Sequence, residues 1–385
     1  MKIDRRNPRH WMRLLRSAMH VAIALVLRPF RKRNIRPTVL LYGHKLGGNL
    51  LALHQALREE AGWSVRFLTL DPEYLLELRA LGIEAVCASA WHVISWFVRA
   101  DAIVTDHGLH ALSPMVRFSD VRFADVWHGI PFKGFDADDF RVQHGYDEVW
   151  VASPLMARMY AERFGFDAAR VHATGYARTD RLARNDEDVA AIRKRLGLQG
   201  SGACVLFAPT WKQDAQDRSL YPFDVPAEDF LAALSAVCER HDATLVVRSH
   251  INSGDTPPPA FPRIVHVPYA RDPDTEGILL ASDVLVCDWS SIAFDYLVLD
   301  RPTIFLDVPA PFAKGFSLGP EHRFGKIVGD FDTLIAALDA YLGDAMAYRR
   351  ELGERPRQVR EAVYGGCADG NATARCVERL QRMVA

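Results

Sequence analysis

The sequence ASDVLVCDWSSIAFDYLVLDRPTIFL, residues 281–306, decides the fold. It predicts a strand, a sharp turn, a helix and a second strand, because the apolar run 284–287 is of the kind that lies buried in a parallel sheet. Ser290 and Ser291 stand where the helix should begin, and serine is a favoured N-cap residue. The unpaired N–H groups at such a helix start are a natural seat for a phosphate. A capped helix without a ligand explains the stretch equally well.

The same alternation of short apolar runs and helical patterns extends in both directions. Strands are expected at residues 39–42, 65–69, 84–87, 102–105, 122–127, 148–151, 171–174, 205–208, 244–248, 264–267, 284–287 and 303–306. Such alternation is typical of doubly wound α/β domains. The sequence turns polar and glycine-rich between residues 184 and 202, which favours a domain boundary there. We therefore expect two Rossmann-like domains, residues 37–185 and 186–385, with the last helix free to pack back on the first domain.

Residues 1–36 stand apart by their charge. They carry eleven Lys or Arg and a single acidic residue, Asp4, whereas the rest of the chain carries 36 basic and 47 acidic residues. Only eleven residues separate Arg16 from Arg28, too few to span a hydrocarbon layer of ~30 Å. We expect a basic amphipathic helix that lies on an anionic membrane surface, which would place the protein peripherally at the cytoplasmic face. A helix packed on the protein's own surface is the alternative. The acidic body argues against a nucleic-acid partner.

The six cysteines are scattered, and no Cys-x-x-Cys pair occurs. Reduced thiols in a cytosolic protein without a zinc site are the simple interpretation. We expect no metal-ligating residues and no resident cofactor, and leave a need for Mg²⁺ open.

In the first domain, polar residues follow the expected strands. His128 comes directly after the strand 122–127, on a tight loop, and a histidine can take a proton from a hydroxyl near neutral pH. Lys133 and Arg178 are candidates for contact with a phosphate or an acceptor. The alternatives are a structural histidine, a solvated lysine, and an ion pair between Arg178 and Asp180.

The second domain shows the same placement of polar residues. Thr210 follows the strand 205–208, and Arg248 and His250 end the strand at 244–248. Ligands of open α/β sheets bind beyond the carboxyl ends of the strands. A histidine and an arginine beside Ser290 and Ser291 could therefore stabilise the charge on a transferring phosphoryl group.

Together these motifs resemble those of the CDP-glycerol glycerophosphotransferase family, the primases and polymerases of teichoic acid and related capsule synthesis. The motifs are WHGIPFK at 127–133, GYARTD at 175–180, APTW at 208–211, RSH at 248–250, DWSS at 288–291, FD at 294–295, RP at 301–302 and DGNA at 369–372. The chain departs from the family pattern at Ile130, Ala177, Trp289 and Asn371, which leaves the donor alcohol and the acceptor open.

The resemblance implies a GT-B-type fold, with a cleft between two Rossmann-like domains. It also implies transfer of glycerol phosphate, or a related polyol phosphate, from CDP-glycerol or another CDP-polyol to a lipid-linked or polymeric acceptor, with release of CMP. His128 is then the expected base on the acceptor hydroxyl, and His250 a second catalytic residue. The donor is expected to meet His250, Thr210, Arg248, Asp288, Ser290 and Ser291. The acceptor or a phosphate is expected to meet Asn49, Lys133 and Arg178.

Two other classes of protein compete with this interpretation. A GT-B glycosyltransferase that uses a nucleotide sugar would release UDP or GDP instead of CMP. A catalytically silent polymer-binding or assembly protein would release no nucleotide. The nucleotide product therefore separates the three.

Overall fold

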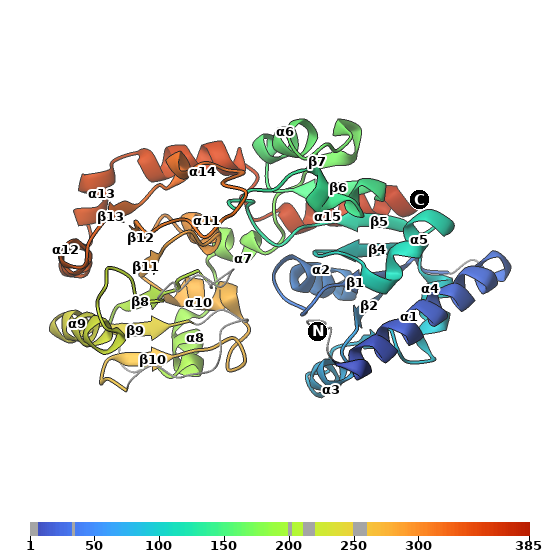
Figure 1. The fold of residues 1–385 in the computed structure, drawn as a ribbon, viewed down its shortest axis with the longest axis horizontal. Coiled ribbons are helices and arrows are strands. Elements are labelled where there is room, and N and C mark those ends of the chain that lie inside the picture. Colours follow the sequence, from blue (N-terminus) through green and yellow to red (C-terminus); the bar gives the residue numbers. More distant parts are fainter. Residues whose placement is uncertain (1–6, 33–34, 199–201, 211–219, 249–259) are drawn as a thin grey trace. The chain divides into compact units, whose positions relative to one another are not determined.

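The computed structural model describes residues 7–32, 35–198, 202–210, 220–248 and 260–385 (Figure 1). The chain folds into two compact units. Unit 1 comprises Met1–His128, Asp136–Asp180 and Gly366–Ala385, and unit 2 comprises Gly129–Phe135 and Arg181–Gly365. Each unit is built around its own parallel sheet.

In the described residues, unit 1 has a seven-stranded sheet of the order β3-β2-β1-β4-β5-β6-β7, with all neighbours parallel. The strands are β1 (Thr38–Tyr42), β2 (Ser64–Thr69), β3 (Ala85–Cys87), β4 (Ala102–Thr105), β5 (Arg122–Asp125), β6 (Glu148–Val151) and β7 (Val171–Ala173). The direction in which strands are added reverses between β1 and β4. Ligands bind at such a reversal, beyond the carboxyl ends of the strands.

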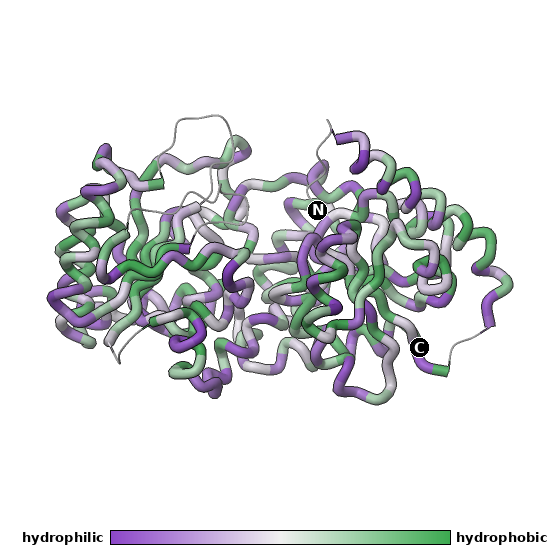
Figure 2. Tube along the Cα trace, turned by 90° about the horizontal axis from the view of Figure 1, so that it is seen from below, coloured by the Kyte–Doolittle hydropathy of each residue, from purple (hydrophilic) through white to green (hydrophobic). Residues whose placement is uncertain are grey.

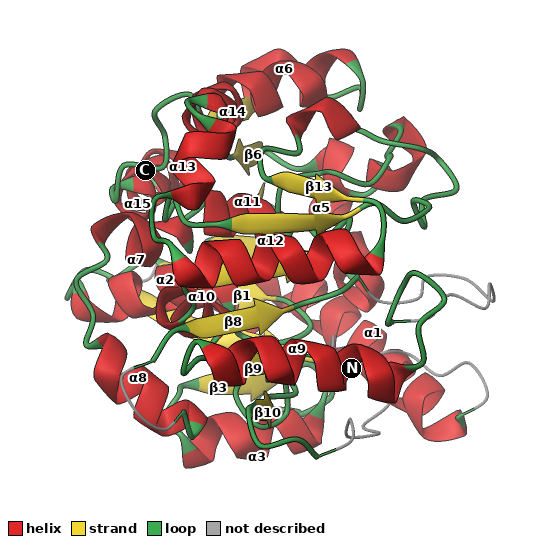
Figure 3. Ribbon diagram, turned by 90° about the vertical axis from the view of Figure 1, so that its left-hand side faces the viewer, coloured by secondary structure: helices red, strands yellow, loops and turns green. Residues whose placement is uncertain are grey.

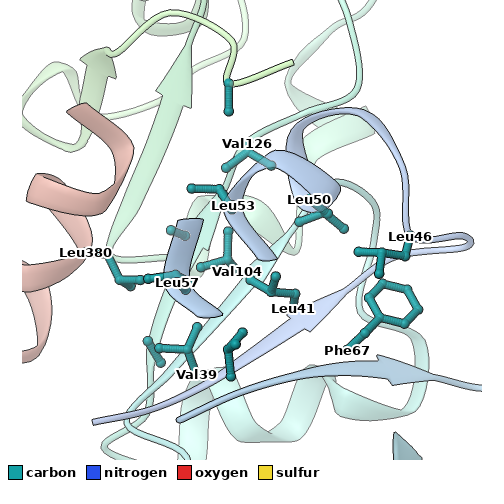
Figure 4. Packing of buried hydrophobic residues seen from close by; sticks show 14 of the residues in the cluster. Val39, Leu41, Leu46, Leu50, Leu53, Leu57, Phe67, Val104, Val126 and Leu380 are labelled. Atoms are coloured by element: carbon teal, nitrogen blue, oxygen red, sulfur yellow. The ribbon is translucent and has the colours of Figure 1, made fainter. Parts of the chain in front are cut away.

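Helices cover both faces of this sheet. They include α1 (Pro8–Leu27), α2 (Gly48–Glu59), α3 (Pro72–Ala80), α4 (Val93–Arg99), α5 (Ser113–Phe118), α6 (Pro154–Glu162) and α15 (Ala372–Val384). Successive residues of a strand point to opposite faces. Val39 and Leu41 of β1 therefore pack with α2 and α15, and Leu40 and Tyr42 with α1 and α4. Figure 4 shows Val39 and Leu41 among the leucines of α2 and Leu380 of α15. Each fully buried leucine contributes about 2 kcal/mol.

Helix α1 rests on unit 1 through one face. Its buried residues are Ser17, His20, Val21 and Ala24. The His20 ring bonds to the Ala88 carbonyl through Nδ1 at 3.0 Å, and buried Arg28 at the helix end donates to the carbonyls of Phe97 and Val98. Contact with the protein's own surface, one of the two arrangements open from the sequence, is therefore present. No helix in the described residues is long and apolar enough to cross a membrane.

The other face of α1 and the turn after it are open to solvent and rich in apolar side chains. The exposed large apolar residues are Trp11, Met12, Leu15, Met19, Val26, Leu27 and Phe30. Basic Arg9, Arg16 and Lys32 are exposed in the same segment. In Figure 2 the helix carries hydrophobic and hydrophilic residues along its length.

Among the residues described, unit 2 contains a six-stranded parallel sheet of the order β10-β9-β8-β11-β12-β13. The strands are β8 (Cys204–Phe207), β9 (Thr244–Val247), β10 (Ile264–His266), β11 (Val284–Cys287), β12 (Thr303–Leu306) and β13 (Lys326–Val328). Its helices include α8 (Val189–Leu196), α9 (Ala227–Arg240), α10 (Thr275–Ala281), α11 (Ile292–Leu297), α12 (Phe331–Gly343), α13 (Ala347–Leu352) and α14 (Arg355–Tyr364). Figure 3 shows α9 and α12 lying along the strands. The strand–turn–helix–strand prediction for residues 281–306 is confirmed as β11, α11 and β12.

The chain leaves unit 1 between two adjacent residues of helix α7 (Thr179–Arg184). The Asp180 carboxylate accepts the N–H groups of Ala372 and Thr373 at 2.9 and 2.8 Å, which caps α15 in unit 1. Arg181 donates to Asp274 in unit 2 at 2.6 Å. The division into units thus falls between Asp180, which bonds within unit 1, and Arg181, which bonds within unit 2, whereas the sequence placed a domain boundary after residue 185.

Residues 129–135, expected in the first domain, belong to unit 2. Lys133 pairs with Phe316 in an antiparallel bridge, and the N–H of Gly134 donates to the carbonyl of Gly315 at 2.7 Å. A Cβ on Gly134 would lie 2.3 Å from the carbonyl oxygen of Lys314, so this approach requires glycine.

Aromatic packing explains this placement. The buried ring of Phe132 lies 5.6 Å from Trp289, 5.2 Å from Phe294 and 5.6 Å from Phe316, measured between ring centroids. These partners are remote in sequence, and aromatic pairs at such distances add to the stabilisation from burial.

Candidate active site

A buried carboxyl group shapes the loop that carries His128. The Asp125 side chain at the end of β5 accepts the N–H of Trp127 at 2.6 Å and the hydroxyl of Thr105 at 3.5 Å. Trp127 has a φ of 45°, a left-handed conformation that bulky residues rarely adopt. Burial raises the pKa of Asp125 to about 8. The turn therefore presents His128 beyond the edge of the sheet at a cost in backbone strain.

Asn49, expected to contact the acceptor or a phosphate, is buried and bonded to the backbone. Its Nδ2 donates to the carbonyls of Val126 and Trp127 at 3.0 and 2.9 Å, and its Oδ1 accepts the N–H of Arg178 at 3.1 Å. The structure thus places Asn49 as a brace between the two loops that carry His128 and Arg178.

Arg178 lies beside His128. Its Nη1 donates to the His128 carbonyl at 2.7 Å. The Asp180 carboxylate, the alternative partner expected for Arg178, accepts two backbone N–H groups at the start of α15. The Arg178 guanidinium therefore places a positive charge next to the candidate base.

His128 is held in one orientation. Its Nδ1 donates to the Asp106 carbonyl at 2.9 Å, which leaves the lone pair on Nε2. The His107 ring stacks on it with a centroid distance of 4.4 Å and an interplanar angle of 8°. A cavity of about 320 Å³ adjoins the two rings. It is lined by His107, Gly108, Trp127, His128, Asp138, Asp139, Arg141, Val142 and Gln143.

The surroundings of His128 keep its imidazole unprotonated. His128 is exposed to solvent as a residue, but the many protein atoms around its ring reduce the hydration of the imidazole. This desolvation, followed by repulsion from a charged His107, lowers the pKa of His128 to about 4. The imidazole is therefore neutral at physiological pH and can accept a proton.

Lys133 lies on the segment that belongs to unit 2, whereas Arg178 and Asn49 lie in unit 1. Its ammonium group stands 5.9 Å from the centroid of the Phe135 ring. The structure therefore does not gather these three candidates into one unit.

Two of the expected donor residues, Thr210 and Asp288, meet at neighbouring strand ends in unit 2. Thr210 follows β8, and its N–H donates to Oδ1 of Asp288 after β11 at 2.8 Å, while its hydroxyl bonds to the same oxygen. Ser290 and Ser291 are half-buried. Ser291 occupies the N-cap position of α11 but makes no side-chain cap bond. No hydrogen bond of either serine hydroxyl is found within the described residues.

The Arg248 side chain has a structural role, because its hydrogen bonds are made to the protein itself. Its buried guanidinium donates to the Asp272 carbonyl and to the Thr275 hydroxyl, both at 3.0 Å, at the start of α10. His250 lies outside the described residues.

Sequence reasoning missed Asp106, His107 and Asp125. A signal was available, since Asp106-His107 directly follows an expected strand, as His128 does. Thr105 and Asp125 pair in the register of β4 and β5. The described residues contain no group of three or more His, Cys, Asp and Glu side chains that could hold a metal ion.

A model of the family described as CDP-glycerol:poly(glycerophosphate) glycerophosphotransferase matches residues 26–382. The chain belongs to this family. Among curated relatives, the teichoic acid ribitol-phosphate polymerase TarL of Staphylococcus aureus is 31% identical, over 63% of this chain and 46% of its own length. The teichoic acid glycerol-phosphate transferase of the same species is 29% identical, over 56% of this chain and 61% of its own. The chain spans about half the length of the curated relatives it matches.

Comparison with solved structures supports the GT-B-type fold expected for this member of the family. The wall teichoic acid polymerase TagF superposes with a TM-score of 0.77 over 96% of this chain and 94% of that chain, at 18% identity. This likeness confirms the GT-B-like class with two Rossmann-like parts.

Proposed function

We propose that the protein transfers glycerol phosphate, ribitol phosphate or a related polyol phosphate from a CDP-polyol to a hydroxyl of a lipid-linked or polymeric acceptor, with release of CMP. Membership in the family supports the donor class. The observation that carries the proposal is His128, a neutral imidazole with Nδ1 anchored and Nε2 left to accept a proton beside a cavity.

In the proposed reaction, Nε2 of His128 takes the proton of the acceptor hydroxyl. The hydroxyl oxygen forms a bond to the phosphorus that carries the polyol. The bond from that phosphorus to the oxygen bridging the two phosphates breaks, and CMP leaves with the bridging oxygen and its electron pair. Positioning and charge stabilisation supply most of the catalysis in such transfers.

We assign the acceptor to unit 1 and the donor to unit 2. Support for the donor role comes from Ser290 and Ser291, whose hydroxyls are spare at the start of α11, next to the Thr210–Asp288 pair. His250 completes this proposed donor set. Arg248 contributes by fixing the loop before α10.

The test is the release of CMP from a panel of CDP-alcohols in the presence of an acceptor. His128→Ala should abolish release while the circular dichroism spectrum is unchanged, and exposed His92→Ala is the matched control. Turnover by His128→Ala close to that of the wild type would overturn the role of the base. Release of UDP or GDP from nucleotide sugars would instead identify a glycosyltransferase, and no nucleotide product at all would identify a binding protein.

We also propose that α1 docks the protein peripherally on an anionic membrane surface at the cytoplasmic face. Leu15 and Val26 are 72% and 69% exposed, and basic residues accompany them. Each basic residue near such a surface contributes about 1 kcal/mol.

The membrane test uses a point substitution, because deletion of residues 1–33 would also remove Val21 and Ala24 from the core of unit 1. Leu15→Glu should reduce sedimentation with vesicles that contain phosphatidylglycerol. Met346→Glu, at an exposed apolar residue of unit 2, should not. Equal sedimentation of the two variants would remove α1 as the docking element.

A further inference from the structure

His107 is the centre of a cluster of histidine rings beyond the carboxyl ends of β1, β4 and β5. Its ring lies parallel to that of His128 at 4.4 Å, and the His44 ring lies 4.5 Å away at an angle of 56°. The Nδ1 atom of His107 is 2.6 Å from Oδ1 of Asp106. This contact fixes the plane of the His107 ring.

Two consecutive residues therefore restrain His128 in two ways. The carbonyl oxygen of Asp106 accepts a hydrogen bond from Nδ1–H of His128, which sets the tautomer. The ring of His107 covers one face of the His128 ring, which limits rotation of the imidazole. We propose that Asp106-His107 is the positioning element of the reaction, with His107 as a stacking platform that keeps Nε2 of His128 aimed at the acceptor hydroxyl. This inference rests on the proposed function of His128.

The surroundings hold this element in place. Asp106 is 7% exposed, and a Cβ on Gly43 after β1 would lie 2.5 Å from Asp106 Oδ1 and 2.8 Å from Leu50 Cδ1. The site thus has room for the Asp106 carboxyl group only because position 43 is a glycine. Burial, and then the neighbouring His110, lower the pKa of His107 to about 4. Neutral imidazoles can stack without the repulsion that two charged rings would feel.

Two substitutions of similar size separate stacking from space filling. His107→Phe keeps a flat ring, whereas His107→Leu fills the space without one. The kcat of His107→Leu for CMP release should fall on the order of 10- to 100-fold, as expected when a reacting group is misplaced by about 1 Å. KM for the CDP-polyol should stay within about twofold, and His107→Phe should retain kcat within about threefold, because the aromatic face is kept.

His110→Asn is the matched control. His110 contacts His44 and Tyr42 in the same cluster but does not stack on His128, and asparagine tolerates its φ of 50°. Its kcat should equal that of the wild type. A loss in folded His107→Phe as large as that in His107→Leu would overturn the stacking role, as would full activity of both.

Nitrogen NMR of the His128 ring gives a readout that does not need turnover. The wild type should show a protonated Nδ1 and an unprotonated Nε2, and His107→Leu should show a mixture of tautomers. An unchanged tautomer in His107→Leu would overturn the positioning role. If the wild type releases no CMP but the tautomer shifts as expected, the proposed function fails while the positioning of His128 stands.

Discussion

Alanine at position 49 should destabilise unit 1 by about 3 kcal/mol. The Asn49 amide makes three hydrogen bonds to backbone groups of Val126, Trp127 and Arg178, and the residue is 3% exposed. A buried hydrogen bond contributes about 1 kcal/mol net, so the loss of three is expected to cost about 3 kcal/mol. That energy corresponds to a roughly 100-fold shift of the folding equilibrium.

Urea denaturation, with hydrogen exchange at the Arg178 N–H as a local probe, measures this loss. Asn371→Ala, at an exposed asparagine, is the control and should change the unfolding free energy by less than about 0.5 kcal/mol. Asn49→Asp should be at least as destabilising as Asn49→Ala, because a carboxylate oxygen would face two carbonyl oxygens. An unfolding free energy of Asn49→Ala within about 0.5 kcal/mol of the wild type would refute the assignment of Asn49 as a brace.

Three further outcomes follow from the packing and the charges. Asp125 has a pKa of about 8 in the folded protein and about 3.9 in the unfolded chain, so it binds its proton more tightly when folded. Stability should therefore fall as pH rises from about 4 to 8. Asp125→Asn should weaken this pH dependence, measured as the midpoint of urea denaturation. Phe132→Ala should cost unit 2 about 3–5 kcal/mol in thermal unfolding, and exposed Phe118→Ala should not. Asp180→Ala should uncap α15, cost about 1 kcal/mol and speed proteolysis near residue 372; an unchanged cleavage rate would count against the cap.

Most strands were predictable because they are buried on both faces, whereas the partly buried strand β13 (Lys326–Val328) was not predicted. Runs such as 39–42 and 284–287 are apolar throughout, and parallel strands with helices on either side require this. The order of the chain then placed His128 and Ser290 after strand ends. Those placements are confirmed, since His128 follows β5 and Ser290 follows β11.

The roles of polar residues were harder to predict, because the residue type alone does not distinguish a side chain that holds a loop in place from one that binds a ligand. Asn49 reaches carbonyls 77 and 78 residues away, and Arg248 reaches the start of α10. Helical periodicity in residues 8–27 likewise indicated an amphipathic helix. It did not show which face of the helix packs against the rest of the protein. That choice depends on contacts such as that between Arg28 and Asp120, 92 residues apart.

Both units are discontinuous in sequence, and this constrains the order in which a newly made chain can fold. Helix α15 supplies Cys376, Val377 and Leu380 to the core of unit 1, so that core stays open at the ribosome until Arg181–Gly365 have been synthesised. Unit 2, by contrast, uses Gly129–Phe135, which emerge early and must wait for Phe316 and Trp289. Unit 2 can therefore complete its fold before unit 1. Chaperones that bind during synthesis should favour the apolar surface of unit 1 that α15 later covers.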